Sequence, residues 1–189
     1  MGIVDPYTLP PDLPEPLDDG GADHLQGMAV PPLVLPSSQG PVDFAQLAAG
    51  RAVLYVYPRS GVPGVPLLPG WNEFPGARGC TPQSCGFRDH AEELAAFGAR
   101  VAGVSAQPLE AQVEFAERNQ MPFPVISDVD LQLRGTLGLP TFEIAGLTLY
   151  SRLALVAEHG TIVKVFYPVF PPDRNAADVL AWLREHRAS

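Results

Sequence analysis

The sequence predicts an α/β fold in which a mixed sheet is covered by helices on both faces. A strand is predicted at Arg51–Tyr57, in which Ala52–Tyr57 is a continuous apolar run with the length of a buried strand. After it, apolar segments of strand length alternate with segments of helical periodicity. Two further strands joined by a short turn, and a last amphipathic helix, close the chain.

Length, composition and charge limit the possible classes of protein. The chain has 189 residues, 46% of them hydrophobic, which suits one domain with a sizeable core. Its net charge of −9 argues against nucleic acid and membrane surfaces as partners, because both attract clustered Lys and Arg. No apolar run reaches the about 18 residues of a membrane span. The acidic start lacks the features of a signal peptide, so we expect a cytoplasmic location.

Proline and glycine divide the chain into segments. Residues 1–31 are rich in Pro, Asp and Gly and are predicted to form an extended arm before the domain at 32–189. Within that domain, residues 59–79 form an insertion loop. Loops of this length are usually functional. The insertion is therefore either a lid, in which Trp71 and Phe74 cover a pocket, or a plain surface insertion.

The remaining elements follow from hydrophobic periodicity. Apolar stripes predict the helices, as Leu109, Val113 and Ala116 do in the second, and Asp173 is expected to cap the last. Further strands are predicted at Pro32–Leu35, Val101–Ser105, Phe123–Ser127, Tyr150–Glu158 and Ile162–Tyr167. Helices are predicted from Cys80 to near Gly98, at Pro108–Asn119, at Asp128–Leu137 and after Asp173.

The two cysteines, Cys80 and Cys85, lie in one short stretch. In a reducing compartment such a pair is more often redox-active or metal-binding than structural. Cys80 is predicted to stand at a helix N-terminus, where unpaired backbone N–H groups and the helix dipole favour a thiolate. The position therefore suits a nucleophile.

The spacing of the two cysteines limits when they can form a disulfide. Five residues along an intact helix separate two Cα atoms by about 9 Å. A disulfide requires Cα atoms within about 7 Å. The bond can therefore form only when the helix start unwinds, which suits a reversible catalytic bond better than a structural one.

A metal site is disfavoured by the same residues. Two cysteines leave a tetrahedral site short of ligands. Cys80, Cys85 and His90 follow at steps of five and point in different directions around a helix. The histidines are His24, His90, His159 and His186. We therefore expect no metal and no other cofactor.

The segment from Gly79 to Asp89 reads GCTPQSCGFRD and resembles the PrxQ peroxiredoxins, also called bacterioferritin comigratory proteins. That family has Gly-Cys-Thr, a second cysteine five positions after the first, and then Gly-Phe-Arg-Asp. Leu54–Pro58 and Met121–Asp128 resemble the family as well, and the likeness covers about residues 24–186. It implies a thioredoxin-like fold of the peroxiredoxin type and reduction of hydrogen peroxide and organic hydroperoxides.

The resemblance also implies residue roles. Cys80 would be the peroxidatic cysteine and Cys85 the resolving one, and a thioredoxin-like dithiol would reduce their intrachain disulfide. Arg152 would hold the thiolate and donate hydrogen bonds to the peroxide. A monomer is expected, with a homodimer as the alternative. The candidate substrate-binding residues are Tyr57, Arg78 and Gly79.

The sequence departs from the family just before the first cysteine. Family members have a Pro-x-x-x-Thr-x-x-Cys motif, but Ala77 stands at the threonine position and Glu73 at the proline position. Pro58 is the displaced counterpart of that proline, separated from Cys80 by the insertion. We therefore expect either a substitute hydrogen-bond donor from the loop or weaker positioning of the peroxide.

Three other functions remain open from the residues. A thiol–disulfide oxidoreductase would share the fold, but that chemistry normally uses Cys-x-x-Cys. A copper-binding chaperone would need closer cysteines and a distant histidine, for which His159 is the candidate. A non-catalytic relative with a binding role is the third, because the family threonine is missing at Ala77.

Overall fold

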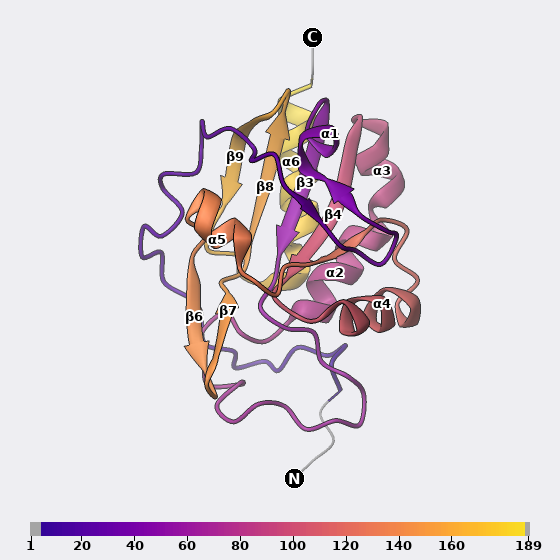
Figure 1. Cartoon of the computed structure of the whole chain (residues 1–189). Helices are drawn as coiled ribbons and strands as arrows, with labels where there is room; N and C mark the ends of the chain where they lie inside the picture. Colours follow the sequence, from indigo (N-terminus) through magenta and orange to yellow (C-terminus); the bar gives the residue numbers. More distant parts are fainter. Residues whose placement is uncertain (1–4, 188–189) are drawn as a thin grey trace.

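A five-stranded mixed sheet forms the centre of the chain, shown in Figure 1 as a computed structural model that describes residues 5–187. The strand order is β5–β4–β3–β8–β9. β3, β4 and β5 run parallel, whereas β8 and β9 are antiparallel to their neighbours. The predicted mixed sheet is therefore confirmed. The strands are β3 (Arg51–Val56), β4 (Ala99–Ser105), β5 (Val125–Ser127), β8 (Leu153–Glu158) and β9 (Thr161–Phe166).

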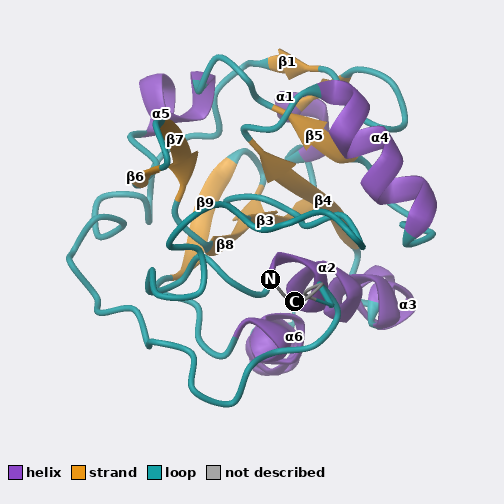
Figure 2. Ribbon diagram, turned by 90° about the horizontal axis from the view of Figure 1, so that it is seen from below, coloured by secondary structure: helices purple, strands orange, loops and turns teal. Residues whose placement is uncertain are grey.

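Helices cover both faces of the sheet, as predicted. Successive side chains of a strand point to opposite faces, so Val53 and Tyr55 belong to one buried cluster and Ala52 and Leu54 to the other. Figure 2 shows α2, α3 and α6 on one side of the sheet and α1 and α5 on the other. The helices are α1 (Phe44–Leu47), α2 (Cys80–Asp89), α3 (Ala91–Ala96), α4 (Leu109–Arg118), α5 (Gln132–Leu137) and α6 (Asn175–Glu185).

A β-hairpin that the sequence analysis did not predict precedes β8. It consists of β6 (Thr141–Ile144) and β7 (Leu147–Tyr150). The prediction of one strand over Tyr150–Glu158 is therefore wrong at its start, because Tyr150 ends β7. Both turn residues have positive φ, 50° at Ala145 and 77° at Gly146, as a tight hairpin turn requires. A second small pair joins β1 (Val34–Leu35) to β2 (Val42–Asp43).

Two helix ends differ from the prediction. The helix that starts at Cys80 is not continuous to Gly98, since His90 ends α2 and begins α3 with φ −100° and ψ 11°. Asp173 does not cap the last helix. It lies in a short 3-10 helix, Pro172–Arg174, and α6 begins after Arg174 without a side-chain cap.

Of the predicted inner face of α4, Ala116 is buried as expected, but Gln112 and Phe115 complete the buried face in place of Leu109 and Val113. Leu109 and Val113 are half-buried, whereas Gln112 is fully buried. Its amide oxygen accepts a hydrogen bond of 2.8 Å from the Tyr57 hydroxyl, and its amide nitrogen donates one of 2.7 Å to the Ile126 carbonyl. These bonds satisfy a polar side chain in the core.

The described part of the arm, residues 5–31, lies on the domain. Arg78 donates hydrogen bonds to the carbonyls of Asp5 (2.8 Å) and Thr8 (3.2 Å). Figure 1 shows the arm's start, the insertion at 59–79 and the β6–β7 hairpin at the same end of the molecule. The boundary between arm and domain at residue 31 stays a prediction. Among residues 5–187, every helix is too short or too polar to cross a bilayer.

Candidate active site

Cys80 is the first residue of α2, as the sequence analysis predicted. Gly79 precedes the helix with φ 104°, a left-handed conformation that glycine adopts without strain. A Cβ atom at Gly79 would also lie 2.3 Å from Cγ of Pro172. Glycine is therefore the residue that lets the chain turn into this helix and places the cysteine at its N-terminus.

The sulfur of Cys80 is buried beside a guanidinium group. The residue is 3% exposed, and Nη2 of Arg152 donates a hydrogen bond of 3.3 Å to its Sγ atom. The Sγ atom also lies 3.6 Å from the carbonyl oxygen of Ala77. A cation at this distance, together with the helix start, stabilises a negative charge on the sulfur.

Arg152 lies between β7 and β8 and is bound from several sides. Its Nη1 donates to the amide oxygen of Gln83, whose amide nitrogen donates a 2.9 Å bond to Asn175. The Nε atom is buried and has no hydrogen-bond partner. Besides the sulfur, Nη2 faces the carbonyl oxygens of Gly76 (3.2 Å), Ala77 (3.0 Å) and Arg78 (3.0 Å). Two N–H bonds thus face four acceptors, one of which is the sulfur.

Cys85 lies on the same helix in a more open environment. It is half-buried, and its thiol lies 3.9 Å from the amide oxygen of Asn119. Burial raises the pKa of the Cys85 thiol, while the charge of Arg88 acts in the opposite direction. Both cysteines are free, and the helix between them is wound. The wound helix keeps the two Cα atoms beyond disulfide distance.

The three predicted substrate-binding residues lie around Cys80 with different surroundings. Gly79 is the helix cap, and the guanidinium of Arg78 is turned to the arm. Tyr57 belongs to the same buried cluster as Cys80, but its hydroxyl is engaged by Gln112. Burial raises the pKa of that hydroxyl. Their contact with a substrate stays a prediction.

The insertion packs its aromatic residues instead of exposing them. Trp71 is 4% exposed and belongs to the buried cluster that contains Cys80. Phe74 stacks on Phe142 of β6, with 4.3 Å between ring centroids. The loop therefore forms a wall next to the cysteine. The carbonyls of residues 76–78, at its end, are the ones that contact Arg152.

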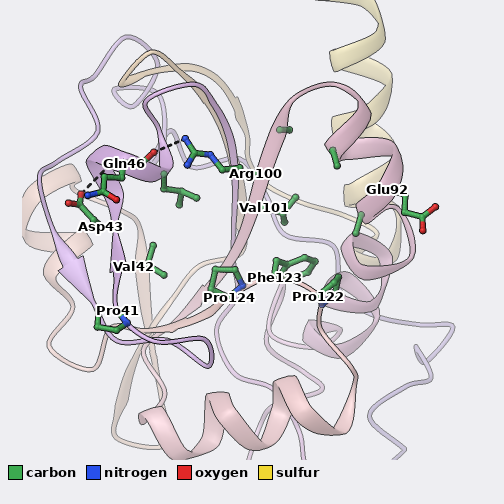
Figure 3. Close-up of a pocket in the computed structure, with 14 residues that line it drawn as sticks. Pro41, Val42, Asp43, Gln46, Glu92, Arg100, Val101, Pro122, Phe123 and Pro124 are labelled. Carbon is green, nitrogen blue, oxygen red and sulfur yellow. Dashed lines mark hydrogen bonds between the residues drawn. The ribbon is translucent and has the colours of Figure 1, made fainter.

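Two cavities differ in their relation to the cysteines. A cavity of about 570 Å³ opens between α1, α3 and residues 122–124 (Figure 3). Neither cysteine lines it, and in Figure 3 Arg100 reaches across its wall to the carbonyl of Gln46 at 2.7 Å. A smaller cavity of about 190 Å³ is lined by Arg152 itself. Neither cysteine lines the smaller cavity either, but Arg152 connects it to the sulfur of Cys80 through a hydrogen bond.

The histidines do not assemble a metal site with the cysteines. Within residues 5–187, no three His, Cys, Asp or Glu side chains gather in a way that could hold a metal ion. His90 is bonded to Glu93 through Nδ1 at 2.8 Å. His159, the histidine considered for copper, lies 3.3 Å from the carbonyl of Ala49.

Sequence reasoning missed three polar residues of the site. Gln83 and Asn175 connect Arg152 to α6, and Asn119 lies next to Cys85. All three are buried. The signal in the sequence was the position of Gln83, one helical turn after Cys80 on the side of α2 that faces the core. An amide side chain at a buried position needs a hydrogen-bond partner.

Comparison with known proteins gives a consistent result. The chain matches the Redoxin family over residues 25–180. It is 29% identical over 165 residues to Peroxiredoxin Q, chloroplastic, of Sedum lineare, covering 86% of this chain and 80% of the relative. It is 27% identical over 164 residues to Peroxiredoxin Bcp of Escherichia coli strain K12, covering 85% and 96%. The crystal structure of peroxidoxin BcpB from Mycobacterium tuberculosis superimposes with a TM-score of 0.68 at 28% identity, over 86% of this chain and 98% of that one.

Proposed function

Because this chain belongs to the redoxin family, with peroxiredoxins Q and Bcp among its relatives, we propose that it is a thiol peroxidase that uses Cys80 and Cys85. The observation that carries the proposal is the 3.3 Å contact between Arg152 and the sulfur of Cys80 at the start of α2. A buried thiolate beside a fixed cation suits attack on a neutral, polarisable O–O bond.

In the first step the Cys80 thiolate attacks one oxygen of the hydroperoxide. The S–O bond forms, the O–O bond breaks, and water or an alcohol leaves after taking up a proton. Negative charge develops on the leaving oxygen. The N–H groups of Arg152 stabilise this charge, because they already point to the sulfur and can be shared with the peroxide. Ala77 stands at the position of the family threonine and has no hydroxyl, and its carbonyl accepts a hydrogen bond from Arg152. Whether the loop supplies a substitute donor stays a prediction.

In the second step the thiol of Cys85 condenses with the sulfenic acid of Cys80 and releases water. The first turns of α2 unwind for this step, since the wound helix keeps the two Cα atoms about 9 Å apart. This unwinding breaks the hydrogen bond of 3.0 Å from the Gln83 N–H to the Gly79 carbonyl and the side-chain bonds of Gln83 to Arg152 and Asn175. Local unwinding of this kind costs less than global unfolding.

An external dithiol, thioredoxin or a protein like it, completes the cycle by reducing the disulfide. The cytoplasm is the proposed location, because such a reductant pool keeps thiols reduced there. We propose a monomer, since the resolving cysteine lies on the same helix as Cys80 and a partner subunit is not needed for the bond. Nucleic acid and membranes have no part in this cycle.

The test is consumption of hydrogen peroxide with thioredoxin and its reductase. The wild-type protein is expected to turn over, and Cys80→Ser to be inactive. Cys85→Ser is expected to be oxidised once per chain and then to stop. Intact mass supplies a second readout, because peroxide should remove two hydrogens from the wild type through an intrachain disulfide. Full activity of Cys80→Ser would refute the assignment, and an unchanged mass would favour a non-catalytic binding role.

A further inference from the structure

Buried polar atoms without hydrogen-bond partners are concentrated at the cysteine pair. Among residues 5–187, four buried side-chain nitrogen or oxygen atoms make no hydrogen bond: the hydroxyls of Tyr55, Thr81 and Ser84, and Nε of Arg152. Folded proteins bond the large majority of such atoms, so each exception needs an explanation. Thr81 and Ser84 lie between the two cysteines, in the segment that unwinds before the disulfide forms.

The two hydroxyls on α2 face the core. Thr81 is 2% exposed and Ser84 is fully buried. Residues three and four apart share one face of a helix, so Cys80, Ser84 and Phe87 form a single buried stripe. In helices, Ser and Thr usually point to solvent or bond the carbonyl four residues back. Neither arrangement occurs at Thr81 or Ser84.

The third hydroxyl approaches the same place from the sheet. Tyr55 of β3 stacks on Phe87 of α2, with 4.5 Å between ring centroids. The hydroxyl end of its ring lies against β4, because a Cβ atom at Gly103 would be 2.6 Å from it. Burial raises the pKa of this hydroxyl, and the nearby Ser84 acts in the opposite direction. The hydroxyls of Tyr55 and Ser84 thus face each other, but without the geometry of a hydrogen bond.

An unbonded hydroxyl destabilises the state in which it is buried. It loses its hydrogen bonds to water and gains none from the protein. When the segment between the cysteines unwinds, Thr81 and Ser84 reach water, and Tyr55 loses the helix that covers it. The gain opposes the cost of breaking the bonds of Gln83 to Arg152 and Asn175.

We propose that the unpartnered hydroxyls of Thr81, Ser84 and Tyr55 destabilise the wound form of α2 and so speed the resolving step. The proposal rests on the peroxidase function above. In that step the S–S bond forms, the S–O bond of the sulfenic acid breaks, and the hydroxyl group leaves as water with the proton of the Cys85 thiol. Attack on the peroxide takes place in the wound helix, so the three hydroxyls leave its rate unchanged.

Faster resolution also protects Cys80. A sulfenic acid that waits for the helix to open can react with a second peroxide and become a sulfinic acid, which a dithiol does not reduce. The hydroxyls shorten this waiting time. They therefore act as positioning residues for the second step, through the helix and not through contact with the peroxide.

The experiment removes one hydroxyl and measures the two steps separately. Thr81→Val keeps the branched shape of the side chain, and Thr and Val have similar helix propensities. We expect a higher Tm and a disulfide that forms about fivefold or more slowly, since an unsatisfied buried group costs at least about 1 kcal/mol. The rate is read as intact mass against time after one equivalent of hydrogen peroxide. Sulfenic acid is trapped with dimedone, and the disulfide form is two hydrogens lighter.

Two further variants separate the hydroxyl from the helix. Ser84→Ala should act in the same direction, although alanine also raises helix propensity. Tyr55→Phe changes no residue of α2, so slower disulfide formation in this variant has no contribution from helix propensity. Both should form sulfinic acid at lower peroxide concentrations than the wild type.

Ser127→Ala is the matched control. Ser127 is 2% exposed, like Thr81, but its hydroxyl donates a hydrogen bond of 2.7 Å to the Gln107 carbonyl. Its loss should lower the Tm and leave the rate of disulfide formation within twofold of the wild type. A merely structural role of Thr81 would give the same result as this control.

The outcomes distinguish this inference from the function on which it rests. In a Cys85→Ser background, Thr81→Val and Tyr55→Phe should oxidise Cys80 at the unchanged rate. A lower Tm in Thr81→Val, or disulfide formation within twofold of the wild type in both variants, overturns the inference and leaves the peroxidase function intact. A wild-type protein that forms no disulfide with peroxide overturns both.

Discussion

Replacing Arg152 by lysine tests the contact on which the proposed chemistry depends. Lysine keeps the positive charge but lacks the planar fork that reaches the Gln83 amide, the backbone carbonyls and the sulfur of Cys80 together. The variant therefore separates the presence of a cation from its position. If position matters, the first oxidation of Cys80 slows even though the net charge of the chain is unchanged.

The magnitude follows from the bond that is lost. A hydrogen bond with a charged partner contributes about 1.5–3 kcal/mol, and each 1.4 kcal/mol of barrier is tenfold in rate. The rate constant for oxidation of Cys80 should therefore fall about 10- to 150-fold in Arg152→Lys. Stability should fall too, because buried carbonyl oxygens at residues 76–78 lose their donor, at about 1–3 kcal/mol for each group left unsatisfied.

The assay isolates the first step by working in a Cys85→Ser background, in which the sulfenic acid accumulates. Samples are mixed with peroxide, trapped with dimedone after set times, and read by intact mass. Arg51→Lys is the matched control. Arg51 is also a buried arginine, bonded to Glu158 (2.7 Å) and to the Phe97 carbonyl (3.2 Å), but it has no contact with either cysteine.

The comparison of the two arginine variants decides the outcome. Both should lower the Tm, since both remove hydrogen bonds of a buried arginine to backbone carbonyls. Only Arg152→Lys should slow oxidation of Cys80. Equal rates in the two variants would show that Arg152 only maintains the structure, and the catalytic role proposed for it would have to be withdrawn.

Two further predictions concern the helix. In a Cys80→Ser background, the rate of Cys85 alkylation against pH should show a midpoint above that of the urea-unfolded chain, because burial favours the protonated thiol. The stability from that shift is present below the unfolded-state pKa and lost as pH rises through the folded-state pKa. Equal midpoints would contradict it. Gly79→Ala should lower the free energy of unfolding by about 1–2 kcal/mol for the left-handed conformation alone, and more for the collision with Pro172. Urea unfolding measures the loss, and wild-type stability would exclude the conformation described.

Strands and helices with continuous or strongly periodic apolar patterns could be predicted from the sequence. The strand beginning at Arg51 and the helix beginning at Cys80 appear where they were expected. The pattern of apolar residues in these segments follows the pattern of burial, because both faces of β3 are covered and one face of α2 is covered. The resemblance to the PrxQ peroxiredoxins is confirmed by the family match.

The remaining features depend on contacts between distant segments. Gln83 and Asn175 look like solvent-facing residues in the sequence, but each satisfies the other across 92 positions of the chain. The β6–β7 hairpin was missed because its turn, Ala145 and Gly146, is not one of the frequent hairpin dipeptides, and because each of its strands has only four residues. Arg152 could be placed beside the sulfur only through the resemblance, since its own neighbours in sequence carry no such signal.

The contact between the arm and Arg78 connects the start of the chain to the catalytic cycle. Arg78 lies two residues before Cys80, so we expect it to move when the first turn of α2 opens. Its hydrogen bonds to the carbonyls of Asp5 and Thr8 then break or pull the arm along. Opening the helix must overcome these bonds as well as those of the helix itself. We therefore expect residues 5–8 to slow disulfide formation, and removal of their contacts to speed a step that takes place far along the sequence.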